Sequence, residues 1–90
     1  MKIDLLQTGE SLFAEGRNQE AEECFRCLLE ETGGTPETYN NLGVIAFHRD
    51  DVSGARKYFS KALAIDPFNC DAMHNIQMLA NFCHPTAPVP

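Results

Sequence analysis

Residues 36–69 have the sequence PETYNNLGVIAFHRDDVSGARKYFSKALAIDPFN, and residues 2–35 are a diverged copy of the same unit. The two copies are identical at Gly9 and Gly43, Phe13 and Phe47, Ala21 and Ala55, Phe25 and Phe59, and Leu29 and Leu63. These residues are small or apolar, the types that packing constrains most. A third, partial copy begins at Cys70, where Asn75 matches Asn41. A fixed period of this length is typical of stacked supersecondary units, which usually bind other molecules rather than catalyse reactions.

Each copy contains apolar residues at helical spacing. We expect five helices and no strand, with the helices at 3–15, 19–31, 37–49, 53–65 and 70–83. Gly16 interrupts the first copy, and Pro36 suits the first position of a helix. Asp51 or Ser53 is expected to cap the next helix, which should end before Pro67. Because the connections within each copy are short, each pair of helices should form an antiparallel hairpin.

The composition restricts the classes of partner. The formal net charge of −6 argues against binding to nucleic acid or to an anionic membrane surface, which both require clustered lysine and arginine. The apolar runs are too short for membrane insertion, and the acidic N-terminal stretch does not resemble a secretory signal. Four cysteines at irregular spacing fit a reducing compartment, so we expect a cytoplasmic protein with free thiols.

The second copy resembles the tetratricopeptide repeat, a unit with the signature W-x2-L-G-x2-Y…A-x3-F…P. The matching residues are Tyr39, Leu42, Gly43, Ala46, Ala55, Phe59 and Pro67. Gly43 and Ala55 are small where the two helices of a hairpin approach each other, and Phe59 is expected to fill the gap between neighbouring units. Gln77 holds the position in the third copy that Gly43 holds in the second, where a partner helix would require a small side chain. We therefore interpret the fifth helix as an end cap.

The resemblance implies an all-α fold, a right-handed α-α superhelix, or solenoid, of antiparallel helix hairpins. It divides the chain into a repeat domain at 1–84 and a flexible proline-rich tail at 85–90. Within the domain, the units are a first repeat at 2–35, a second repeat at 36–69 and a capping helix at 70–83.

In this family the first helix of each unit lines a concave face, and the resemblance places the candidate peptide-binding residues there. They are Leu6, Glu10, Phe13, Asn40, Asn41, Val44, Phe47, His48, His74, Asn75 and Met78, with Glu37 and Asp71 on the same face. Asn41 and Asn75 occupy equivalent positions, and each amide offers a donor and an acceptor for the backbone of an extended peptide. For the apolar members, a role in the core is the alternative.

One class of ligand is disfavoured by resemblance. Family members that grip the C-terminal carboxylate of chaperones use lysine and arginine in this groove. Here Leu6, Glu10, Asp71 and Asn75 stand where those cations are needed. We therefore expect a neutral, basic or amphipathic segment rather than an acidic tail.

The remaining motifs carry little chemistry. Cys24 and Cys27 share one expected helix, so a metal site is disfavoured, and no serine or histidine has a recognisable catalytic partner. We expect no metal, no cofactor and no enzymatic activity, and we interpret the chain as a protein–protein interaction module. The alternatives are a self-associating domain and an accessory binding region of a larger bacterial-type enzyme. Self-association into a homodimer would use the outer side of the first helix or an apolar edge at Met78 and Phe82.

Overall fold

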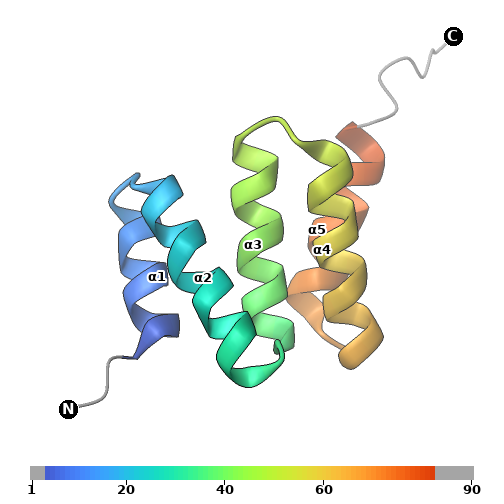
Figure 1. Ribbon diagram of the computed structural model, residues 1–90. Helices are drawn as coiled ribbons and strands as arrows, with labels where there is room; N and C mark the ends of the chain where they lie inside the picture. Colours follow the sequence, from blue (N-terminus) through green and yellow to red (C-terminus); the bar gives the residue numbers. More distant parts are fainter. Residues whose placement is uncertain (1–3, 83–90) are drawn as a thin grey trace, which may run out of the picture.

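The computed structural model describes residues 4–82 and contains five helices in that range (Figure 1). They are α1 (Leu5–Ala14), α2 (Asn18–Thr32), α3 (Pro36–His48), α4 (Val52–Ile65) and α5 (Cys70–Phe82). No strand occurs in this range, so the predicted all-α fold and the five helices are confirmed. Pro36 is the first residue of α3, as expected, whereas several other helix ends differ slightly from the prediction. The ends of the predicted repeat domain and the predicted tail at 85–90 lie outside the described residues.

Side chains at the helix starts explain where most of the helices begin. In four helices, the side chain of the residue directly before the helix accepts a hydrogen bond from a backbone N–H of the first turn, at 2.9–3.2 Å. These residues are Asp4 before α1, Thr35 before α3, Asp51 before α4 and Asn69 before α5. Each bond satisfies a donor that the helix itself leaves without a partner. The bond at Asp51 explains why α4 begins at Val52 rather than at the predicted 53. Gly33 ends α2 in the left-handed conformation, with φ of 81°.

In each complete hairpin, a glycine of the first helix packs against a phenylalanine of the second. A Cβ atom added to Gly9 would lie 2.6 Å from Phe25 Cε1, and one added to Gly43 would lie 2.6 Å from Phe59 Cδ1. Both phenylalanines are fully buried, with 1% and 0% of their surface exposed. The ring therefore occupies the volume that any larger side chain on the facing helix would need. The expected close approach of the paired helices is present in both units.

The apolar cores lie between units as well as within them. One cluster joins Ala21 and Phe25 of α2 to Leu42 and Ile45 of α3. The other contains Ala46 of α3, Ala55 and Phe59 of α4, and Leu79 of α5. Each hairpin thus buries its apolar surface against its neighbour, as the resemblance to a stacked array requires.

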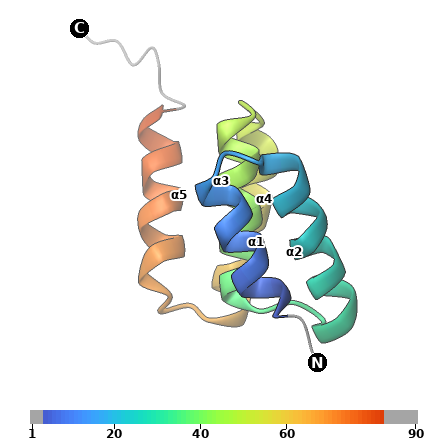
Figure 2. The same cartoon turned by 90° about the vertical axis from the view of Figure 1, so that its left-hand side faces the viewer.

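Helix α3 is the centre of the array. It contacts each of the other four helices, and Figure 2 shows α2 and α5 on opposite sides of it. Contacts of α1 with α3 and of α3 with α5 place these three helices in one row. The first helices of successive units therefore line a common surface. No helix among residues 4–82 has the length and apolar character required to cross a membrane.

The exposed apolar side chains of the described range extend beyond the edge expected from the sequence. The large apolar side chains exposed in the described range are Ile65, Phe68, Met73 and Met78. Met78 belongs to the expected apolar edge, whereas the apolar side chains of α1, such as Leu5 and Leu12, are half-buried. The side chain of Phe82 lies outside the described part of the chain. Gln77 is exposed, in agreement with the absence of a second helix against it within residues 4–82.

Candidate functional site

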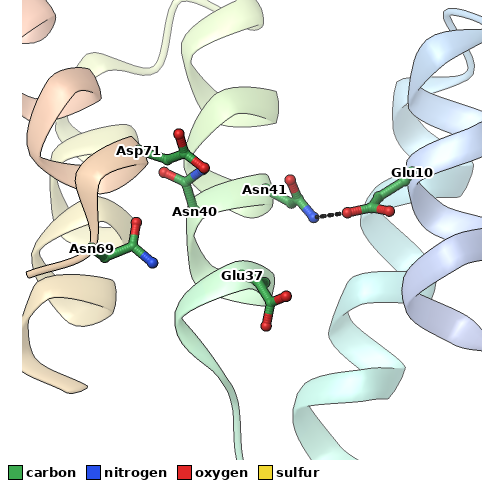
Figure 3. A pocket seen from close by; sticks show the side chains of 6 residues that line it. All are labelled: Glu10, Glu37, Asn40, Asn41, Asn69 and Asp71. Atoms are coloured by element: carbon green, nitrogen blue, oxygen red, sulfur yellow. Dashed lines mark hydrogen bonds between the residues drawn. The ribbon is translucent and has the colours of Figure 1, made fainter. Parts of the chain in front are cut away.

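A pocket open to solvent lies on the surface shared by α1, α3 and α5 (Figure 3). It has an empty volume of about 490 Å³. Its lining consists of Glu10, Glu37, Asn40, Asn41, Asn69 and Asp71. All of these side chains end in a carboxylate or an amide, and Glu10, Asn40 and Asn41 are among the predicted site residues. We call this site the carboxylate pocket.

The local structure explains why these side chains meet. Glu37, Asn40 and Asn41 follow the i, i+3, i+4 spacing in the first half of α3, so they share one face of the helix. Glu10 reaches the pocket from α1, and Asp71 lies in the first turn of α5. The pocket is consequently built from helices that belong to three different units.

Two hydrogen bonds join these helices across the surface. Asn41 Nδ2 donates to Glu10 Oε2 at 3.3 Å, a contact drawn as the dashed line in Figure 3. Asn75 Nδ2 donates to Asn40 Oδ1 at 2.9 Å. Asn41 and Asn75, which hold equivalent positions in successive units, therefore each bond to the first helix of the preceding unit. Both side chains thus connect neighbouring units, in addition to facing the predicted groove.

The pocket is acidic and carries mainly acceptors. Glu10, Glu37 and Asp71 contribute carboxylates, and no lysine, arginine or histidine among the described residues belongs to the lining. The Asn41 amide donates one N–H to the Glu10 carboxylate, and its Oδ1 is an acceptor. Such a surface suits a ligand that brings hydrogen-bond donors or positive charge.

A second cluster lies further along the same row of helices. Phe13 of α1 and His48 of α3 meet edge to face, with 5.4 Å between ring centroids, and Phe47 and His48 are 6.1 Å apart. Val44 lies one turn before Phe47 and His48 on α3. We call these four residues the aromatic shelf. His48 is exposed, and the other three are half-buried.

The other predicted site residues have different surroundings. Leu6 and Phe13 pack against the core cluster that joins α2 to α3, and Val44 and Phe47 pack against the second cluster. These four side chains thus belong partly to the core, which was the alternative interpretation. His74 and Met78 are exposed on α5 and are not part of the pocket lining.

The cysteines do not form a metal site with the acidic residues in the described range. Cys24, Cys27 and Cys70 are free thiols, and no group of three or more candidate ligands among residues 4–82 is arranged to hold a metal ion. Desolvation by burial, followed by the nearby Cys27 and two glutamates, raises the pKa of Cys24 above its ordinary value. A raised pKa lowers the fraction of this thiol that is present as the reactive thiolate.

Comparison with known families identifies the repeat. Residues 36–69 match the family model of the tetratricopeptide repeat. The chain carries a tetratricopeptide repeat. The resemblance found in the sequence is thereby confirmed, and the described helices form the hairpin solenoid that this family implies. The tetratricopeptide repeat is a helical repeat fold that usually serves protein–protein interaction.

Two curated proteins of Komagataeibacter xylinus are similar to the chain. They are named Cellulose synthase 1 operon protein C and Cellulose synthase operon protein C, and each is 29% identical over 65 residues. The aligned region is 72% of this chain but 5% of each relative. The chain therefore spans a small fraction of the length of these relatives.

One residue that lines the pocket, Asn69, was not predicted from the sequence as a site residue. Asn69 precedes the partial third repeat, and its side chain caps α5 by accepting from Ala72 N at 2.9 Å. Asparagine directly before a predicted helix is a recognised capping signal, so its position was available from the sequence. Glu37 and Asp71 were assigned to the concave face, but only the structure shows that they line a pocket with Glu10.

Proposed function

We propose that the chain is a non-enzymatic module that binds a peptide or protein segment in the groove formed by α1, α3 and α5. The observation that supports this proposal is the carboxylate pocket, where polar side chains from three units converge on a solvent-open space. The aromatic shelf beside it offers apolar contact area. Together they provide hydrogen bonding and apolar burial, which extended peptides use for affinity and specificity.

Peptide display followed by NMR mapping tests this proposal. A peptide selected on the purified chain is titrated into the isotope-labelled protein, and shifted amide and side-chain signals are recorded. We expect the largest shifts at Glu37, Asn41 and His48. Lys57 and Ser60, exposed on the opposite face of α4 from its buried side, serve as internal controls. Shifts centred on α2 and α4, or failure to select any peptide, would reject the groove as the binding site.

Self-association is a second candidate, supported by a different surface. Ile65, Phe68 and Met73 are exposed to 51%, 86% and 42%, and they lie close together along the chain. Clustered apolar side chains at a surface are common at interfaces. Sedimentation at high micromolar concentration distinguishes the two functions. A monomer under these conditions, unchanged by Phe68→Ser, argues against a homodimer.

The third candidate, an accessory binding region of a larger bacterial-type enzyme, is supported by the names of the two relatives, which place them in cellulose synthase operons. Immunoblotting of the native source for a polypeptide well above 10.0 kDa tests this candidate. As the compartment we propose the cytoplasm, because free thiols are usual in a reducing environment. Oxidation of these cysteines in protein isolated from cells would contradict that proposal.

A further inference from the structure

The groove has two levels of different chemistry along α3. The first half of the helix supplies Glu37, Asn40 and Asn41 to the carboxylate pocket, and the second half supplies Val44, Phe47 and His48 to the aromatic shelf. A ligand that lies along this helix therefore meets a polar, acidic site and an apolar site in a fixed order. This order restricts which segments fit.

No cationic side chain of residues 4–82 lines the pocket. Most of the arginines in the described range lie in other contacts. Arg17 pairs with Glu15 and Glu20, and Arg26 and Arg49 both pair with Glu22. The cations of α4 do not line the pocket either. The three pocket carboxylates are therefore complementary to a cation that the ligand supplies.

The hydrogen bonds within the pocket use some of its acceptors. Asn40 Oδ1 is occupied by Asn75, and Asn69 Oδ1 is occupied by the backbone N–H of Ala72. The three carboxylates and Asn41 Oδ1 remain as acceptors, and the side-chain N–H groups of Asn40 and Asn69 remain as donors. A lysine ammonium has three donors and no acceptor, and an arginine guanidinium has five donors and no acceptor. Either group matches the three carboxylates and Asn41 Oδ1, whereas an acidic side chain is repelled by the carboxylates.

The distance between the two levels sets the spacing in the ligand. About two turns of α3 separate Asn40 from Phe47, which corresponds to about 10 Å along a helix with a rise of ~1.5 Å per residue. In the polyproline II conformation, residues three apart point to the same side and lie about 9 Å apart. In a β-strand, residues three apart point to opposite sides.

We propose that the groove binds an extended, polyproline II-like partner segment with a lysine or arginine in the carboxylate pocket and an apolar residue three positions away on the aromatic shelf. This inference rests on the proposed function, since it names the ligand of the same groove. The groove would then prefer a basic ligand, whereas the family members that bind a C-terminal carboxylate prefer an acidic one.

Fluorescence anisotropy with labelled peptides tests the proposal. The parent peptide is proline-rich and carries one lysine and, at the third position after it, one leucine. The same pair is also made in reverse order, and the tighter of the two serves as reference. The variants replace lysine by glutamate, replace leucine by alanine, or move leucine one position closer. We expect each change to raise Kd, and the change to glutamate to raise it at least about tenfold.

Matched protein variants show whether the pocket is responsible. Glu37→Lys should weaken the lysine peptide about tenfold or more and strengthen the glutamate peptide. Glu30→Lys on α2 changes the net charge equally at an exposed position outside the groove, and it should alter Kd by about twofold at most. Circular dichroism confirms that both variants are folded.

Three results would overturn the inference: equal effects of the two variants, equal binding of the lysine and glutamate peptides, or no measurable binding by either reference order. The NMR mapping separates this failure from that of the proposed function. A display-selected peptide that shifts Glu37, Asn41 and His48 without carrying a basic residue leaves the groove as a binding site and rejects the basic ligand.

Discussion

Gly43→Ala tests how closely α3 and α4 must approach. A methyl group at Gly43 would lie 2.6 Å from Phe59 Cδ1 and 2.9 Å from Cζ, whereas carbon atoms prefer about 3.5–4.0 Å. The ring must therefore move by about 1 Å. It has little freedom to do so, because Phe59 is fully buried in the cluster that contains Leu79.

Two opposing effects determine the expected change. Alanine in a helix is favoured over glycine by about 0.5–1 kcal/mol, and overpacking a core costs about 1–3 kcal/mol. The overpacking prevails because the ring is buried on all sides, so we expect Gly43→Ala to lower the free energy of unfolding by about 1–2 kcal/mol. For a domain of this size the melting temperature should fall by roughly 5–15 °C.

Urea and thermal unfolding followed by circular dichroism at the helical band measure the effect. Phe59→Leu provides the critical comparison, because a smaller side chain removes the clash. The double variant should be more stable than the sum of the two single changes predicts, and such coupling is expected only for residues in contact. Ser60→Ala, at an exposed position of α4, controls for general changes in helix stability. If Gly43→Ala is as stable as the parent chain, or is not coupled to Phe59, the close-approach reasoning is refuted.

Three further changes test other contacts. Asn75→Ala should lower the free energy of unfolding by about 1 kcal/mol, because it leaves the half-buried Asn40 amide without its bond; an unchanged urea midpoint would show that this bond is not stabilising. Asp51→Ala removes the cap of α4 and should cost about 1 kcal/mol in urea unfolding, whereas Asp51→Asn should recover most of the loss. Cys24 should react with iodoacetamide at neutral pH more slowly than the exposed Cys70, because its raised pKa lowers the thiolate fraction and its side chain is half-buried. Peptide mass spectrometry over time measures the two alkylation rates, and equal rates would contradict this prediction.

The sequence was sufficient to predict the parts of the fold that depend on local pattern. Apolar residues at helical spacing located all five helices of the described range, and the small residues Gly43 and Ala55 indicated the close approach within the hairpin. Phe59 was expected between neighbouring units, and it both packs against Gly43 of its own hairpin and shares a cluster with Leu79 of α5. Helix ends were less certain, because a capping side chain such as Asp51 decides the first residue of the helix, and Ser53 was an equally reasonable candidate.

The site could be predicted only in outline, because its details depend on how one unit stacks on the next. Resemblance to the family placed Glu10, Asn41 and Asn75 on one face. The bonds that they form depend on the offset between helices of different units, and that offset does not follow from the pattern of either helix. Asn41 bonds to a residue 31 positions earlier and Asn75 to one 35 positions earlier, so even equivalent positions have non-equivalent partners.

The exposed Gln77 indicates how the array can be lengthened by protein engineering. Gly9 and Gly43 each pack against a phenylalanine of the following helix, and an alanine precedes that phenylalanine by one helical turn. Gln77 offers a long polar side chain at the equivalent place, and it lies beside the exposed Met73 one turn earlier. A helix added here with alanine and phenylalanine in the same register would require a small residue at position 77, as in Gln77→Gly. Among the described residues, position 77 thus distinguishes α5 from the two first helices that pack closely against a partner.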